Sequence, residues 1–381
     1  TDGDGDSVGA FNAGSFVIDV EDDVPQLVEQ SERGVWNQVQ EDALTLVDGA
    51  PYEGNDEGGQ VTVASGGPGT LSALVDFGAD GPGAFGISAD LGPLEDQGFT
   101  SGGVALSYSL VGNVLTATAG GEAIFTLTVN PDGSYEFVLE GPLDHPIADS
   151  ALDDETLPGL GIDFSGLITA TDGDDDPLAV DLDAGSFTID VEFDVPEARV
   201  VGQRPWVSNQ VDEDELPGGI TDGDGTTNVA VGAAGALHAA IAFGADGPGL
   251  VGLSDDPLDI ATLEAQGLTS GGDPLSYSVV GNLLTAMAGG SPVFTLQVNG
   301  DGSYTFTLLG PLDHPLADGT PAGDNELLGL PIDFSALITA TDGDGDPLAG
   351  LNAGSFVIQV EDDIPVAVPP QYDQTQQPIP L

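Results

Sequence analysis

Three short loops of this chain place aspartates on alternate residues: TDGDGDS (1–7), TDGDDDP (171–177) and TDGDGDP (341–347). Carboxylates crowded in this way repel one another unless a cation lies among them. Hard oxygen ligands at about 2.3–2.6 Å are what Ca²⁺ takes in proteins. The loops therefore predict structural calcium, with these candidate ligands: Asp172, Asp174, Asp176, Asp342, Asp344 and Asp346. An ordinary solvated turn stays open as an alternative, because Asp and Gly both favour turns.

The loops are not EF-hands. Counted from Asp342, the sixth position is Pro347 and the twelfth is Ala353, where an EF-hand needs glycine and a bidentate glutamate. The tandem nonapeptides of calcium-binding β-rolls are also missing. The expected site is thus an acidic loop between two strands.

A second acidic motif ends three apolar stretches: IDVEDDVP (18–25), IDVEFDVP (189–196) and IQVEDDIP (358–365). It resembles the calcium-binding linker of cadherins, and its candidate ligands are Glu21, Asp22, Asp23, Glu192, Asp194, Glu361 and Asp363. Phe193 replaces an acid in the middle copy, so we expect that junction to hold fewer ions. A third motif, VQEDAL (39–44) and VDEDEL (211–216), adds Asp212 and Asp214 as candidates.

The composition narrows the choice of partners. With 65 acidic and three basic residues, the net charge is −62, which disfavours nucleic acid and anionic membranes as partners. Apolar residues make up 40% of the chain and fall in periodic runs, so a folded protein is expected rather than disorder. Without cysteine there is no disulfide and no zinc–thiolate site. No run of about 18 apolar residues exists, so direct membrane insertion is not expected.

Internal repetition sets the expected domain organisation. LSYSLVGNVLTATAGG (106–121) returns as LSYSVVGNLLTAMAGG (275–290), and PDGSYEFVLEGPLDHP (131–146) as GDGSYTFTLLGPLDHP (300–315). We divide the chain into the end of a preceding repeat (1–25), two repeats (26–195 and 196–365) and a Pro/Gln-rich tail (366–381). The chain begins inside a repeat and carries no signal peptide, so we read it as a segment of a longer protein.

Alternating apolar and polar residues between turn signals predict an all-β sandwich fold. We expect tandem immunoglobulin-like β-sandwiches, arranged as an elongated rod. Asp132-Gly133 predicts a hairpin turn, and residues 257–266 predict a short helix, with a weaker one near 93–97. Whether each repeat is one sandwich or two subdomains is left open. Strands at about 162–170 and 186–192 are expected to form the last hairpin. The 172–176 loop should then face residues 21–23, and the 342–346 loop should face Glu192 and Asp194.

The sequence supports a catalytic role less well than calcium binding. His145 and His314 are equivalent within LDHP, but each lacks a recurring partner in the sequence, which favours a packed or capping role. Pairs of carboxylates suit a glycosidase, yet such pairs arise by chance in so acidic a chain. We expect no enzymatic activity.

Together, DED-L, FGADGPG, LSYS…LTA, GSYTFTLLGPLDHP, ITATDGDGDPL and V-E-D-D-V-P resemble the extender repeats of giant bacterial RTX adhesins exported by type I secretion. The resemblance covers all but the last 16 residues. It implies a calcium-bound spacer on the surface of a Gram-negative cell, used in attachment or biofilm. Its partners would be neighbouring repeats of the same chain, in a monomeric rod. A calcium-dependent module that binds carbohydrate or protein is the alternative.

Overall fold

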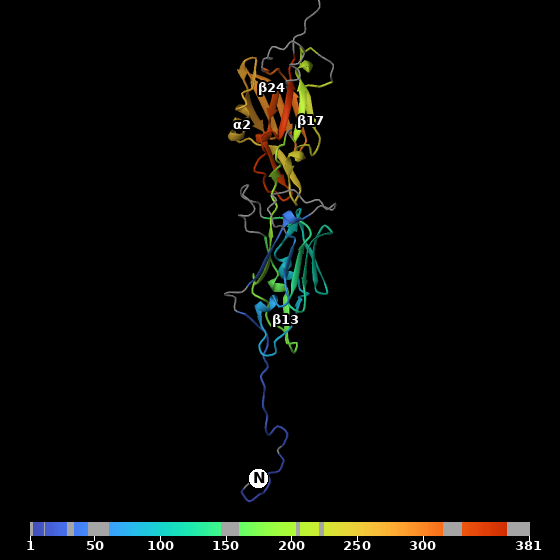
Figure 1. The fold of residues 1–381 in the computed structure, drawn as a ribbon, viewed down its shortest axis with the longest axis vertical. Coiled ribbons are helices and arrows are strands. Elements are labelled where there is room, and N and C mark those ends of the chain that lie inside the picture. The colour runs from blue at the N-terminus through green and yellow to red at the C-terminus, as the bar shows by residue number, and fades with distance from the viewer. Residues whose placement is uncertain are drawn as a thin grey trace, which may run out of the picture.

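The computed structural model describes residues 3–10, 12–28, 34–44, 61–145, 160–202, 206–220, 225–314 and 330–363. It is mostly β, with 42% strand, and its two similar sets of sheets indicate two β domains. The sets follow one another along the longest axis of the molecule, the first in blue to green and the second in yellow to red (Figure 1). No helix among the described residues is long and apolar enough to cross a membrane.

The larger sheet of each set has five antiparallel strands. In the first set its order is β3 (Val63–Gly66), β11 (Tyr135–Leu139), β10 (Glu122–Val129), β9 (Val114–Ala119) and β8 (Ser107–Val111). In the second it is β17 (Val229–Gly232), β25 (Tyr304–Leu308), β24 (Ser291–Val298), β23 (Leu283–Ala288) and β22 (Ser276–Val280). The hairpin predicted at Asp132-Gly133 is confirmed, since Val129 pairs with Tyr135 and Leu127 with Phe137.

A three-stranded sheet accompanies each larger one. It consists of β12 (Leu160–Asp163), β14 (Phe187–Glu192) and β2 (Val35–Gln40), and in the second set of β26 (Leu330–Asp333), β28 (Phe356–Glu361) and β16 (Val207–Asp212). β14 and β2 run parallel, as do β28 and β16. The strand that ends each repeat is therefore the central strand of its sheet.

Short pairs and turns complete each set. The pairs are β1 (Gln26–Leu27) with β4 (Val75–Asp76), β5 (Pro82–Ile87) with β13 (Ile168–Asp172), β6 (Thr100–Ser101) with β7 (Val104–Ala105), β15 (Glu197–Ala198) with β18 (Ile241–Ala242), β19 (Pro248–Leu253) with β27 (Ile338–Asp342), and β20 (Thr269–Ser270) with β21 (Asp273–Pro274). The expected short helices form as α1 (Gly92–Glu95) and α2 (Pro257–Glu264). One-turn 3₁₀ helices lie at Glu41–Ala43, Leu71–Leu74, Ser165–Leu167, Glu213–Glu215, Leu237–Ala240 and Ser335–Leu337.

The predicted last hairpin is partly wrong. β14 pairs antiparallel with β12, but β13 pairs with β5 instead. The turn at Ser165–Leu167, with Ser165 and Leu167 fully buried, takes the chain out of the three-stranded sheet between β12 and β13. The hydroxyl of Ser165 accepts a hydrogen bond from the amide of Phe187 at 2.9 Å, which fixes the exit point.

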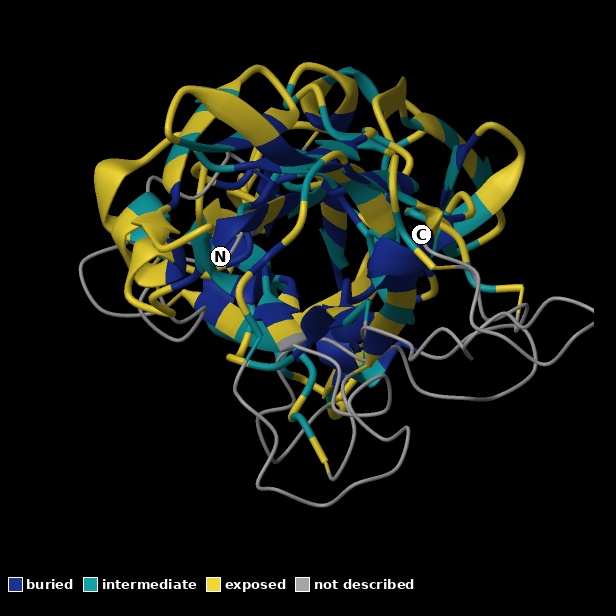
Figure 2. Ribbon diagram, turned by 90° about the horizontal axis from the view of Figure 1, so that it is seen from above, coloured by how far each residue is buried: buried dark blue, intermediate teal, exposed yellow. Residues whose placement is uncertain are grey.

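Aromatic side chains join the two larger sheets of each set. Phe125 and Phe137 from the five-stranded sheet contact Phe164, which contacts Phe187 from the three-stranded sheet, with ring centroids 5.8–6.0 Å apart. All four are fully buried. The second set repeats this arrangement with Phe294, Phe306, Phe334 and Phe356. Seen along the long axis, buried residues face inward and exposed ones lie on the outer loops (Figure 2).

Residues 16–20 form no strand, although their counterparts are β14 and β28. Phe16, Val17, Ile18 and Val20 are all exposed. β14 lies between β12 and β2, which are supplied by earlier residues of its own repeat. No described strand of this chain takes those two places beside residues 16–20. The 366–381 tail and Pro365 lie outside the described residues.

Candidate metal centres

The acidic loops at 171–177 and 341–347 are each closed by their own backbone and by one aspartate oxygen. The amide of Asp342 donates to the carbonyl of Asp346 at 3.1 Å, and the amide of Asp346 donates to Oδ1 of Asp342 at 2.7 Å. Asp172 and Asp176 make the same pair of contacts, at 3.0 and 2.8 Å. Oδ2 of Asp172 and Oδ2 of Asp342 are buried and make no hydrogen bond within the described chain. One oxygen of each first aspartate thus builds the loop, and the other stays available to a cation.

We call the contact between residues 19–25 and the first β domain the first seam. Asp22 and Asp174 meet there with Asp80, and one carboxylate oxygen from each lies within 4.8 Å of the others. Asp172, Asp174 and Asp176 form a second group of the same size. The expectation that the 172–176 loop faces residues 21–23 is met at Asp22. The hydrogen bond that Asp174 makes with Asp172 raises the pKa of Asp174 to about 6, and burial and other carboxylates add to the rise.

We call the contact between the two β domains the second seam. Asp246, Asp342 and Asp344 offer carboxylate oxygens within 4.8 Å of one another. Burial, and then the charge of Asp344, raises the pKa of Asp246 to about 8. Burial raises the pKa of Asp342 to about 9, with further contributions from its hydrogen bond to Asp344 and from that group's charge. Without a cation, the protein therefore disfavours the ionised form of these acids.

The last acid of one repeat docks onto a turn of the next at both seams. Oδ2 of Asp194 accepts from the amide of Ala245 at 2.8 Å, and Oδ2 of Asp23 accepts from Ala79 at 3.0 Å. Asp194 also raises the pKa of Glu41 and of Asp246 through its charge. Asp194 therefore lies in the acidic centre of the second seam, where the sequence predicted it.

The first domain contributes further groups to the second seam. The backbone amide of His145 donates to Oδ2 of Asp344 at 3.0 Å. Glu41 is fully buried, and its pKa is raised well above the usual value, first by burial and then by the charge of Asp246. The ring of Phe193 lies 3.8 Å from that of His145, measured between centroids, so an aromatic contact occupies the place that Asp22 and Asp362 hold in the other copies.

Other predicted ligands lie apart from these centres. Glu21 is exposed. Glu192 accepts from Nε2 of Gln38 and of Gln40, both at 2.7 Å, on the neighbouring strand β2. Glu361 likewise accepts from Nε2 of Gln210 on β16. Both glutamates therefore bridge parallel strands in the structure.

Near the end of the second domain, Asp212 and Asp214 are buried, and Oδ1 of Asp212 accepts from the amide of Asp214 at 2.9 Å. Oδ1 of Asp363 is buried without a hydrogen bond among the described residues. Glu213, His314 and Asp362 offer ligand atoms within 4.8 Å of one another. We call these last three residues the terminal group.

Sequence reasoning missed several members of these centres: Glu41, Asp80, His145, Glu213, Asp246, His314 and Asp362. FGADGPG occurs in both repeats, and the acid it retains is Asp80 in one copy and Asp246 in the other. That shared acid was the available signal. Several buried or partly buried acidic clusters of this protein can thus bind metal ions such as Ca²⁺.

Part of the chain matches a known family of domains. Residues 210–350 match a family described as a domain of unknown function (DUF5801). None of the curated proteins matches the chain. The match covers the greater part of the second β domain.

Proposed function

We propose that this chain is a calcium-stiffened spacer of a bacterial cell-surface adhesin, built from immunoglobulin-like β-sandwich repeats in an elongated rod. The observation that carries the proposal is the position of the acidic centres, which lie where one repeat meets the next. At the second seam, Asp194 comes from the end of one domain, while Asp246 and Asp344 come from the next. A cation bound there would hold two domains in one orientation, because its ligands come from both.

The burial of these carboxylates supports a structural ion. Asp342 is 1% exposed and its Oδ2 atom has no hydrogen bond among the described residues. A buried carboxylate is costly unless it is paired, protonated or bound to a metal. The three basic residues of the chain, Arg33, Arg199 and Arg204, cannot neutralise 65 acids, so an external cation is the natural counterion.

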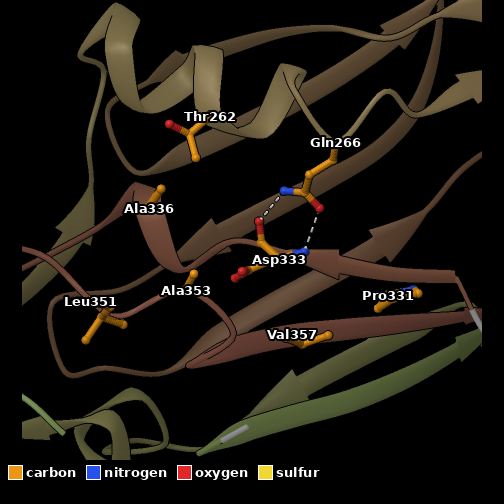
Figure 3. A pocket seen from close by; sticks show the side chains of 8 residues that line it. All are labelled: Thr262, Gln266, Pro331, Asp333, Ala336, Leu351, Ala353 and Val357. Carbon is orange, nitrogen blue, oxygen red and sulfur yellow. Dashed lines mark hydrogen bonds between the residues drawn. The ribbon is translucent and has the colours of Figure 1, made fainter. Parts of the chain in front are cut away.

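A ligand-binding module is the second candidate, and the pocket of the second β domain gives it little support. The pocket in Figure 3 has a volume of about 470 Å³, and its eight lining residues include no aromatic side chain. Gln266 donates to the carbonyl of Asp333 at 2.7 Å and accepts from its amide at 3.0 Å (Figure 3). Gln97 clamps Asp163 in the same way in the first domain. These polar groups thus hold the fold together in both repeats.

The remaining features follow from the resemblance to RTX adhesin extenders. We place the protein outside a Gram-negative cell after type I secretion, as a monomeric segment that projects an adhesive tip for surface attachment or biofilm formation. Its partners are the neighbouring repeats of the same chain. We assign it no enzymatic role, and neither nucleic acid nor membrane is a partner.

Thermal unfolding of the full chain tests the need for calcium. We expect calcium to raise the melting temperature strongly over chelator, and magnesium to do so poorly, because Mg²⁺ requires near-octahedral geometry and keeps its water. Each filled site adds about 2.7 kcal/mol when calcium is at 100 times its dissociation constant. Sodium chloride at matched ionic strength controls for screening of the net charge of −62. Equal melting in calcium and in matched sodium chloride would show that no specific calcium site stabilises the fold.

A further inference from the structure

Two equivalent groups in this protein combine a histidine with two carboxylates. Glu41, His145 and Asp246 form one group at the second seam, and the terminal group of Glu213, His314 and Asp362 is the other. In each, one ligand atom per residue lies within 4.8 Å of the other two. The calcium proposal uses carboxylates alone and leaves both imidazoles without a role.

The group at the second seam is buried and has unused polar atoms. The side chains of Glu41 and His145 are 0% and 1% exposed. Oε1 of Glu41 accepts from the amide of Leu143 at 2.7 Å, whereas Oε2 makes no hydrogen bond among the described residues. Nε2 of His145 is also buried without a hydrogen bond there, and lies 3.9 Å from Oε1 of Glu41. The packing of Phe193 on the His145 ring does not supply that nitrogen with a hydrogen-bond partner.

The terminal group repeats this construction. Oε1 of Glu213 accepts from the amide of Leu312 at 2.7 Å, as Glu41 does from Leu143. Nε2 of His314 lies 3.3 Å from Oε1 of Glu213, and Nδ1 of His314 is buried with no hydrogen bond in the described part of the chain. The side chains of His314 and Glu213 are each 5% exposed. The same glutamate–histidine pair thus occurs in both domains.

The third ligand differs between the groups. Asp246 belongs to the next domain, so the first group is complete only when two domains meet. Asp362 belongs to the same domain as Glu213 and His314, and it stands where the first repeat has Phe193. Asp246 is also a member of the oxygen-only group with Asp342 and Asp344. It is therefore placed to bridge two neighbouring ions at the second seam.

We propose that both histidine-containing groups bind a divalent transition-metal ion of the Zn²⁺ class, in sites distinct from the oxygen-only calcium centres. Calcium and magnesium take oxygen ligands, whereas imidazole suits zinc and related ions. One imidazole and two carboxylates supply three protein ligands, and water can complete a tetrahedral shell. The LDHP histidines are then metal ligands as well as packed side chains.

Nuclear magnetic resonance of the histidine ring protons tests this in the full chain with saturating calcium. The chain has three histidines, His145, His238 and His314. His238 packs against Phe243 and belongs to neither group, so it is an internal control. Addition of Zn²⁺ should shift the resonances of His145 and His314 and leave His238 unchanged. His145→Gln and His314→Gln assign the two signals.

Matched substitutions separate the two sites. Asp246→Asn should weaken zinc binding at His145 by at least about tenfold and leave His314 unaffected. Asp362→Asn should do the reverse. No shift at His145 and His314, or an equal shift at all three imidazoles, would overturn the proposal. Calcium-dependent melting measured without zinc is a separate result, so failure here leaves the calcium proposal standing.

Discussion

At the scale of single residues, a few buried carboxylates dominate the electrostatics of this protein. Asp246 and Asp342 have pKa values raised to about 8 and about 9, in each case first by burial and then through contact with Asp344. An acid whose pKa rises on folding binds its proton more tightly in the folded state. Its contribution to stability is present below its unfolded pKa of about 4 and is lost as the pH rises through the folded value.

The pH dependence of unfolding should therefore change sign with calcium. In metal-free protein, we expect the urea midpoint to fall between pH 5 and pH 9, as Asp246 and Asp342 ionise at the second seam. With calcium bound, the same acids are already ionised, and stability should instead fall as the pH drops towards 5 and protons compete with the metal. Urea titrations across this range, with and without calcium, provide the measurement.

Asp246→Asn is the matched control for this prediction. Asn cannot ionise, so the metal-free variant should lose less stability than the wild type as the pH rises. Asp132→Asn changes an exposed turn acid, whose pKa is lowered chiefly by hydrogen bonds from Ser134. This variant should show the same fall of the urea midpoint with pH as the wild type. If the urea midpoint changes with pH in the same way in calcium and in chelator, a metal ion does not offset the burial of Asp246 and Asp342.

At the scale of elements, the FGAD turn (77–80 and 243–246) lies against the last acid of the preceding repeat at each seam, with its glycine at the contact. Gly244 has φ +75°, and a Cβ there would collide with the carboxylate of Asp194. Gly247 in the same turn has φ +69°, but a Cβ there would meet nothing within 4 Å. Both positions have a positive φ, so a side chain costs a similar conformational free energy at each. Of the two, only Gly244 lies against the preceding domain.

Gly244→Ala should therefore weaken the second seam more than Gly247→Ala. Both variants carry the left-handed penalty of about 1–2 kcal/mol, and Gly244→Ala additionally disrupts the hydrogen bond from Ala245 to Asp194, worth about 1.5–3 kcal/mol to a charged acceptor. Hydrogen exchange of the Ala245 amide is the direct readout. Exchange should quicken in Gly244→Ala relative to Gly247→Ala. The same rate in both variants would mean that the docking of Asp194 does not hold the seam.

The sequence predicts much of the local structure and less of the pairing. Alternation and turn residues identify β10, β11 and the turn between them, because all the information lies in neighbouring residues. It does not identify the parallel pairing of β14 with β2 or the antiparallel pairing of β13 with β5, because these partners are distant in the chain. The turn at Ser165–Leu167, where the chain leaves the three-stranded sheet, was missed for the same reason.

The candidate site was predictable to a similar degree. Repeated acids identified the loops and the docking residue Asp194. Glu192 was expected to face the 342–346 loop, and the structure shows its carboxylate accepting hydrogen bonds from Gln38 and Gln40 on β2. It alternates in phase with Asp190 on β14 and so lies on the face away from the buried Val191. Asp246 could not be assigned from one sequence position, because a single acid in a glycine-rich turn is common on any surface. Only the fold brings it to Asp344.

At the scale of the whole molecule, ionisable groups of both β domains meet at the second seam. Among the described residues, Ala245 is an apolar contribution at the second seam, since it packs within the first domain's core. The surrounding acids, Asp194, Asp246, Asp342 and Asp344, repel one another without a cation. An inter-domain contact of this kind permits relative motion by default. Under the proposed function, calcium is the component that fixes the angle between the domains.

Small-angle X-ray scattering of the full chain, with calcium and after its removal at matched ionic strength, tests the calcium-stiffened spacer most directly. We predict one extended, rigid particle with calcium and a flexible two-domain particle without it. The combined variant Asp342→Asn, Asp344→Asn, Asp346→Asn should stay flexible in calcium, whereas the same change at Asp172, Asp174 and Asp176 should leave the second seam rigid. Superimposable profiles with and without calcium would contradict the account.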